Sequence, residues 1–108
     1  MFVTAYQSDA WALIADASRR AIIERLSQSP CSVAELAGGM SISRPAVSQH
    51  LKLLREAGIV RDEPHGRQRV YSLDAARLQR YRRQLDQFWS DALGNLAATL
   101  DEQEGEVG

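Results

Sequence analysis

The chain has 108 residues, of which 44% are hydrophobic, and its formal net charge at pH 7 is −1. This length fits one domain with a modest core, and no apolar run reaches the roughly 18 residues that a membrane-spanning helix needs. Cys31 is the single cysteine, so no disulfide forms within the chain, and no signal-like segment opens the sequence; we therefore expect a cytoplasmic protein.

Two helices are predicted before residue 30. Residues 9–15 read as a short helix with apolar Trp11 and Ile14. Ser18 is the expected N-cap of the second helix, whose apolar residues follow at helical spacing: Ala21, Ile22, Ile23 and Leu26. Ser29 and Pro30 end it.

A third helix is predicted to begin at Val33, because Ser32 and Glu35 form a capping-box pattern. Gly38 and Gly39 stop this helix after barely two turns. A tight connection then leads to Ser43, which is the expected N-cap of the next helix.

The helix after Ser43 is predicted to run to residue 57. Pro45 lies in its first turn, where the missing N–H costs nothing, and Gly58 is the expected left-handed stop. Its core-facing residues repeat at i, i+4 and i+7: Val47, Leu51 and Leu54. The opposite, polar face carries Arg44, Ser48, Lys52 and Arg55, with Gln49 at its margin.

Residues 59–63 and 68–72 are strand-like, and residues 64–67 form the predicted turn. Because a two-stranded hairpin is marginal alone, it must pack against the helices. Helix, turn, helix and basic hairpin in this order predict a winged helix-turn-helix, a mainly α fold with a two-stranded β-hairpin wing.

Asp74 is the expected cap of a last helix that runs to about residue 100. Its apolar stripe is wider than a small three-helix core can cover. We therefore predict that the first and last helices form a homodimer interface with two-fold symmetry, although the last helix folding back over its own domain is an alternative. The expected interface residues are Trp11, Ile14, Leu85, Phe88, Trp89, Leu93 and Leu96.

The charges are unevenly distributed. Residues 44–83 carry ten basic and four acidic side chains, whereas residues 84–108 carry six acidic side chains and neither Lys nor Arg. A basic centre is expected of a DNA-reading surface, but charge alone also fits two solvated faces. The predicted domains are a DNA-binding and dimerisation domain at 1–100 and a disordered acidic tail at 101–108.

A helix in the major groove reads base edges through side chains such as Arg, Gln and Ser. We expect Arg44 to bind guanine, Gln49 to bind adenine and Ser48 to bind a base or a phosphate. Ser43 is placed to bind a phosphate or to act only as a cap. Lys52 and Arg55 lie further along, where phosphate contact or solvation is expected.

The wing and the remaining histidine complete the candidate DNA contacts. Arg67 and Arg69, with His65 nearby, suit phosphate or minor-groove contact, and alternation along a strand points both arginines the same way. The alternative is a solvated hairpin. His50 is a further DNA-contact candidate, but packing within the domain is its more ordinary role.

These motifs together resemble the ArsR family of winged-helix repressors. The resemblance covers about residues 10–100 and rests on three stretches: residues 15–23 (ADASRRAII), residues 43–60 (SRPAVSQHLKLLREAGIV) and residues 66–73 (GRQRVYSL). It implies a homodimeric transcriptional repressor that binds an inverted repeat near a promoter.

Metal-sensing members of the family carry Cys-x-Cys before the recognition helix, or Asp and His ligands on the last helix. Here the matching stretch begins at Ser32 with only Cys31 nearby, and the last helix contains no His. Soft or borderline metals need thiolate or imidazole ligands, and these ligands are missing at both family positions. The chain therefore resembles a branch without metal motifs, and we expect no cofactor.

Three other functional classes are less well supported by the sequence. An enzyme lacks support, since the sequence has no Gly-rich phosphate loop and no Cys–His pair at plausible spacing. A winged-helix module that binds protein instead of DNA would not need its basic residues on one surface. A thiol-responsive repressor would use Cys31, but a resolving cysteine is missing. The sequence identifies neither the operator, the regulated genes nor an inducer.

Overall fold

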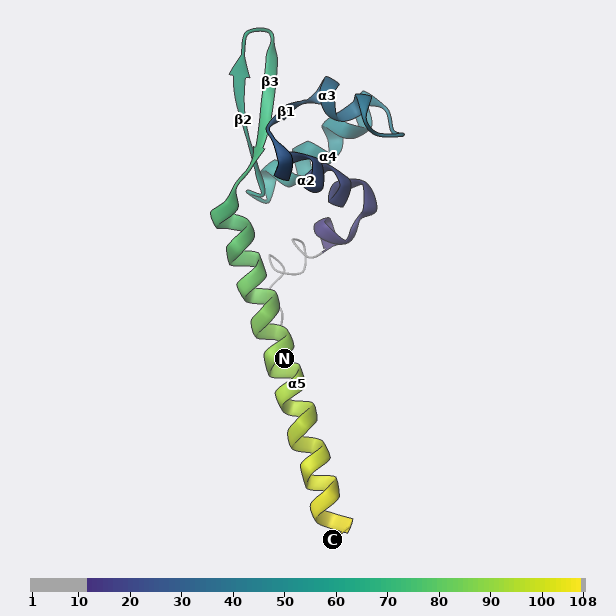
Figure 1. Ribbon diagram of the computed structural model, residues 1–108, viewed down its shortest axis with the longest axis vertical. Helices are drawn as coiled ribbons and strands as arrows, with labels where there is room; N and C mark the ends of the chain where they lie inside the picture. Colours follow the sequence, from purple (N-terminus) through teal and green to yellow (C-terminus); the bar gives the residue numbers. More distant parts are fainter. Residues whose placement is uncertain (1–11, 108) are drawn as a thin grey trace. The chain divides into compact units, whose positions relative to one another are not determined.

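A computed structural model describes the backbone of residues 12–107 and the side chains through residue 103. The chain divides into two compact units, the first ending at Leu78 and the second beginning at Gln79. Residues 12–15 are helical, and the elements that follow are α2 (Ala17–Gln28), β1 (Cys31–Ser32), α3 (Val33–Gly38), α4 (Arg44–Glu56), β2 (Val60–His65), β3 (Gln68–Leu73) and α5 (Ala75–Val107) (Figure 1).

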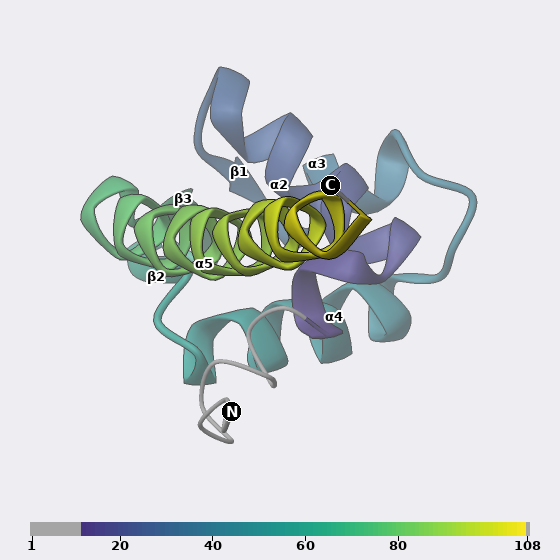
Figure 2. The ribbon, with the colours of Figure 1, turned by 90° about the horizontal axis from the view of Figure 1, so that it is seen from below.

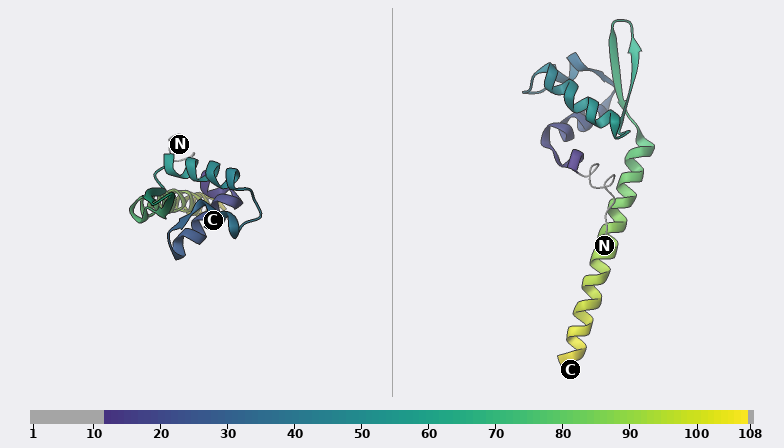
Figure 3. Two further views of the ribbon diagram at one scale, coloured as in Figure 1. Left: turned by 90° about the horizontal axis from the view of Figure 1, so that it is seen from above. Right: turned by 180° about the vertical axis from the view of Figure 1, so that it is seen from behind.

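The first unit has the predicted winged helix-turn-helix architecture. Helices α2, α3 and α4 lie together to one side of the β2–β3 hairpin (Figures 1 and 3). Their buried apolar side chains form one core, which also takes in the residues that lead into the hairpin. The core residues are Ile22, Leu26, Cys31, Leu36, Val47, Leu51, Leu54, Ile59 and Val60.

The sheet has three antiparallel strands in the order β1-β3-β2, whereas the sequence predicted only the two-stranded hairpin. The added strand pairs Cys31 with Tyr71 and Ser32 with Val70. Two residues are too few to show an alternating pattern, which is why the sequence did not predict β1. Ser32 already has the extended backbone of a helix N-cap, with φ −80° and ψ 167°, so pairing requires no extra conformational change.

Three of the four predicted caps are present. Ser32 and Glu35 form the capping box: the Glu35 N–H donates to Ser32 Oγ at 3.2 Å, and the Ser32 N–H donates to Glu35 Oε1 at 3.0 Å. Ser43 Oγ accepts from the Ala46 N–H at 3.2 Å, and Asp74 Oδ1 accepts from the Arg77 N–H at 3.0 Å.

The cap predicted at Ser18 was wrong. Asp16 caps α2, because its carboxylate accepts a hydrogen bond from the Arg19 N–H at 3.0 Å. A carboxylate is a strong cap, and it is also favoured by the partial positive charge of the helix start. This bond is the main cause that lowers the pKa of Asp16.

Gly58, which follows α4, has the expected left-handed backbone, with φ +77°.

The hairpin departs from its predicted turn. Strand β2 continues through Pro64 to His65, which pairs with Gln68, so the turn is only Gly66 and Arg67. Pro64 is tolerated because β2 is an edge strand, where a missing N–H leaves no ladder partner unsatisfied.

Helix α5 runs without a break to Val107 (Figure 2). The sequence had placed its end near residue 100 and a disordered tail at 101–108, but the backbone of 101–107 is helical. Glu and Gln are good helix formers, and extending an existing helix requires no new nucleation. Within the described residues, no helix is long and apolar enough to cross a membrane.

Candidate nucleic-acid interface

The orientation of α4 is fixed by its buried face. Val47, Leu51 and Leu54 are fully buried, and they recur at the helical spacing that places them on one side. Burying three such side chains contributes on the order of 5 kcal/mol, so rotating α4 about its axis is costly. The opposite face is therefore held toward solvent.

That solvent-facing side of α4 carries the polar residues predicted to contact DNA. Arg44, Ser48, Gln49 and Lys52 are all exposed. Ser43, at the start of the helix, is also exposed and combines its cap with a hydroxyl proton that is still available to donate. The helix thus presents donors and acceptors of the kind that read base edges and phosphates.

His50 has a different environment from its neighbours on α4. It is half-buried, and its Nδ1 lies 3.3 Å from Nη1 of Arg19 on α2. Arg19 also donates from Nε to the Leu13 carbonyl oxygen at 3.0 Å and lies 3.8 Å from the Asp16 carboxylate. His50 therefore links α4 to α2, the within-domain role that was its alternative interpretation.

The wing is tied to α4 by one carboxylate. Asp62 on β2 lies 2.7 Å from Arg69 on β3 and 3.4 Å from Arg55 on α4, and the Asp62 side chain is only 11% exposed. The hydrogen bond from Arg69 is the main cause that lowers the pKa of Asp62, and it raises the pKa of Arg69. Arg69 thus has a structural partner within the protein.

Arg67 and His65 lie at the end of the wing. Both are exposed, and Arg67 lies in the turn, as predicted, so the alternation expected between Arg67 and Arg69 along one strand does not apply. No ion pair joins Arg67 to a carboxylate within residues 12–103. Its guanidinium is therefore available to an anion outside the protein.

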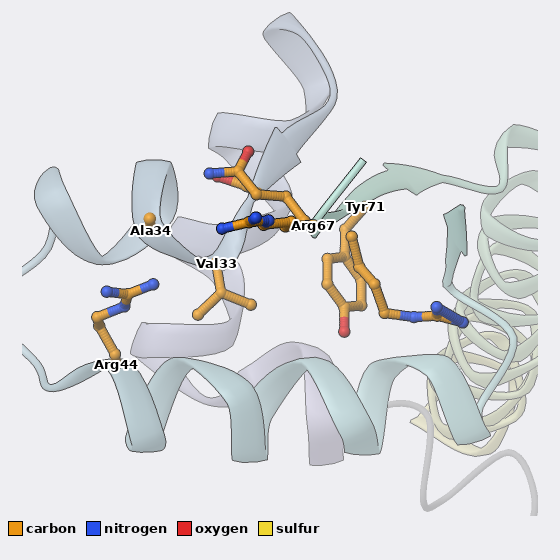
Figure 4. A pocket seen from close by; sticks show the side chains of 8 residues that line it. Val33, Ala34, Arg44, Arg67 and Tyr71 are labelled. Carbon is orange, nitrogen blue, oxygen red and sulfur yellow. The ribbon is translucent and has the colours of Figure 1, made fainter. Parts of the chain in front are cut away.

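A hollow of about 260 Å³ lies between the wing and the helices. Arg44 reaches into it from the start of α4, and Arg67 and Tyr71 border it from the wing (Figure 4). We call it the α3–wing hollow, and its lining residues are Ser32, Val33, Ala34, Arg44, Arg67, Gln68, Arg69 and Tyr71.

Similarity to known proteins identifies the family. A family model described as "Bacterial regulatory protein, arsR family" matches residues 16–62, from the cap of α2 into β2. The HTH-type transcriptional regulator Rv2034 of Mycobacterium tuberculosis is 50% identical over 94 residues, which cover 87% of this chain and 88% of that protein. The chain belongs to the ArsR family of transcriptional regulators.

A further relative and a solved structure are also transcriptional regulators by name. The transcriptional repressor SdpR of Bacillus subtilis is 33% identical over 66 residues, covering 61% of this chain and 73% of that protein. The solved structure of an ArsR-like transcriptional regulator from Rhodococcus sp. RHA1 superposes with a TM-score of 0.76 at 29% identity, covering 87% of this chain and 89% of that one.

For this ArsR-family chain, the residues predicted to contact DNA are brought together only in part. Arg44 and Arg67 border one hollow, and Ser48, Gln49 and Lys52 share the exposed side of α4. Within residues 12–103, no three His, Cys, Asp or Glu side chains gather as a group that could hold a metal ion.

The predicted dimer residues of this ArsR-family chain are largely exposed. Trp11 lies outside the described residues, and Ile14 and Phe88 are half-buried. The remaining predicted interface residues on α5 are between 38% and 59% exposed: Leu85, Trp89, Leu93 and Leu96.

The sequence reading missed Asp62 and Arg19 as organising residues. The signal for Asp62 was present in the hairpin register: once the turn is Gly66–Arg67, Asp62 lies diagonally opposite Arg69 on the same face. The signal for Arg19 was weaker, because its partner His50 lies on another helix, 31 residues away.

Proposed function

We propose that this ArsR-family regulator is a cytoplasmic, homodimeric repressor that binds an inverted repeat in double-stranded DNA near a promoter. Each α4 enters a major groove, and Ser48 and Gln49 contact base edges there. Lys52 and the wing arginines contribute phosphate contacts. The observation that carries this proposal is the solvent-facing polar side of α4, held in place by three fully buried residues on its opposite side.

Homodimerisation is supported by the exposed apolar face of α5. Leu85, Trp89, Leu93, Leu96 and Leu100 are 38–59% exposed. At 100° per residue, their spacing of four, four, three and four residues keeps all five within an arc of about 80°. A continuous apolar stripe in water is a liability in a monomer, and a second copy of the same helix covers it in a two-fold symmetric dimer.

A second copy also doubles the number of base pairs that are read, because each protomer contributes one α4. Two α4 helices related by a two-fold axis contact half-sites roughly 34–36 Å apart, about one turn of DNA. The operator is then a palindrome, because the two protomers read the same half-site sequence.

Selection of bound duplexes from a random-sequence library tests the proposed function without a known operator. Wild-type protein is expected to enrich an inverted repeat with half-site centres about one helical turn apart. Gln49→Ala is expected to lose the preference at one base pair of each half-site while the other positions are retained. Enrichment of no motif by the wild-type protein would reject sequence-specific DNA binding.

Mutation of Cys31 provides a check against the thiol-responsive alternative. Cys31 is fully buried, and its thiol lies 3.5 Å from the Ser29 carbonyl oxygen. A buried thiol is poorly accessible to oxidants. If mild oxidation changes the DNA affinity of the wild-type protein, Cys31→Ser is therefore expected to show the same change.

A further inference from the structure

The α3–wing hollow combines basic side chains from two separate parts of the chain. Arg44 is the first residue of α4, and Arg67 lies in the turn of the wing. In Figure 4 these two side chains flank Val33 and Ala34 of α3, which are small enough to leave the space between them open. The fold therefore directs two guanidinium groups toward one small volume.

The charge within the hollow is positive and only partly compensated. Its lining contains three arginines and no carboxylate. Arg69 is neutralised by Asp62, at 2.7 Å. Within residues 12–103, neither Arg44 nor Arg67 has an ion pair with a carboxylate. Two like charges around a shared space repel each other, and an anion that enters the space removes this repulsion.

The position of the hollow decides which anion fits. Ser48 and Lys52 follow Arg44 by one and two helical turns on the exposed side of α4. A group contacted by both the start of α4 and the wing lies at the edge of the groove, where the DNA backbone runs, and not at a base edge inside it. Guanidinium groups bind the oxygens of a phosphate through paired, charge-assisted hydrogen bonds.

We propose that the α3–wing hollow is a phosphate subsite, in which Arg44 and Arg67 together bind a single phosphodiester of the DNA backbone in each half-site. This inference rests on the proposed DNA-binding function and adds a role for Arg44: it positions the protein on the backbone, in place of the guanine contact expected from the sequence. Base reading is then left to residues further along α4.

The salt dependence of binding to the library-selected duplex tests the subsite. In B-DNA, log K falls with log salt by about 0.9 for each phosphate that is neutralised. Arg44→Gln and Arg67→Gln are each expected to weaken binding about tenfold. The double variant is expected to flatten the slope by about 0.9 per protomer, because the two arginines share one phosphate. Two separate phosphates would instead flatten it by about 1.8 per protomer.

Two further variants separate phosphate binding from base reading. A phosphate accepts Lys as a point charge, whereas a bidentate guanine contact is specific to the arginine fork. Arg44→Lys is therefore expected to restore most of the DNA affinity that Arg44→Gln loses. Both Arg44 variants are expected to select the same DNA motif as wild type. Arg82→Gln removes one charge from an 82%-exposed side chain on α5 and is expected to leave the slope unchanged.

Several results would overturn the subsite. One is a relaxed base pair in the motif selected by Arg44→Gln, and another is a double variant whose slope equals that of wild type. A third is binding of inorganic phosphate by wild-type protein, measured by calorimetry, together with unchanged DNA affinity in both single variants; the hollow would then serve a free anion. If the wild-type protein enriches no motif in the selection, the proposed function itself would be rejected.

Discussion

Nε of Arg69 on β3 lies 2.7 Å from Oδ2 of Asp62 on β2, and the same carboxylate oxygen lies 3.4 Å from Nη1 of Arg55 on α4. One acidic side chain therefore connects both strands of the wing to the helix that is proposed to enter the major groove. Asp62 therefore links the wing to α4, and in the proposed complex this link would help to keep the two elements in one geometry at the DNA.

Replacing Asp62 by Asn is expected to weaken this connection. The arginines are about half-exposed, so solvent screening limits the effect, and the free energy of unfolding is expected to fall by about 0.5–1 kcal/mol. Urea denaturation measures this change. Glu63→Gln is the matched control, because Glu63 is an exposed neighbour on the same strand. Equal stabilities for the two variants would contradict the role of Asp62.

The lowered pKa of Asp62 sets the pH range in which this contribution is present. In the unfolded chain, Asp titrates near pH 3.9. Above that pH, the carboxylate is ionised in both states and its contribution is complete; as the pH falls toward the lower folded-state pKa, the unfolded state takes up the proton first and the contribution is lost. Wild type and Asp62→Asn are thus expected to differ in unfolding free energy at pH 7 and to converge as the pH falls below the unfolded-state pKa toward the lower folded-state pKa of Asp62. A constant difference across this range would contradict the linkage.

Gly58 is required by its backbone conformation and by its surroundings. Its φ is +77°, and a Cβ atom there would lie 3.0–3.2 Å from the guanidinium of Arg77. Gly58→Ala is expected to lower the free energy of unfolding by about 1–2 kcal/mol. Gly66→Ala tests backbone strain alone, because φ there is +62° with open space around the added carbon. If thermal unfolding shows that Gly58→Ala lowers the free energy of unfolding no more than Gly66→Ala does, the contact with Arg77 has no cost.

Leu93 lies in the exposed apolar stripe of α5 and is 59% exposed. A charge at this position would be buried without a partner in the proposed dimer, so Leu93→Glu is expected to shift the protein to monomer at micromolar concentration in sedimentation velocity experiments. Ser90→Glu introduces the same charge about 100° away from the centre of the stripe and is expected to remain dimeric. A dimeric Leu93→Glu variant would place the interface elsewhere.

Most of the fold was predictable because its signals are local. The caps at Ser32, Ser43 and Asp74 depend on side chains within three residues of the helix start, and the buried face of α4 follows from helical spacing. The cap at Ser18 was mispredicted because Asp16, two residues earlier, is an equally good cap by residue type. Nothing in the residue types alone decides between them.

Features that depend on distant pairing were not predictable. Strand β1 exists only because Cys31 and Ser32 meet β3 about 40 residues later. The predicted turn of residues 64–67 already placed Asp62 opposite Arg69, but Arg69 was interpreted only as a DNA contact or as part of a solvated hairpin. The second contact of Asp62, with Arg55 on α4, depends on how the wing packs against that helix. The exposed side of α4 was correctly anticipated, but the convergence of Arg44 and Arg67 on one hollow required the placement of α3 between them.

Sequence-specific binding through α4 is the central claim, and fluorescence anisotropy tests it most directly. Wild-type protein is titrated into the library-selected duplex and into a scrambled duplex of equal length, both at the same physiological salt concentration. We predict a preference of about a thousandfold or more for the selected duplex, reduced in Gln49→Ala. Equal, weak binding to both duplexes would contradict the account.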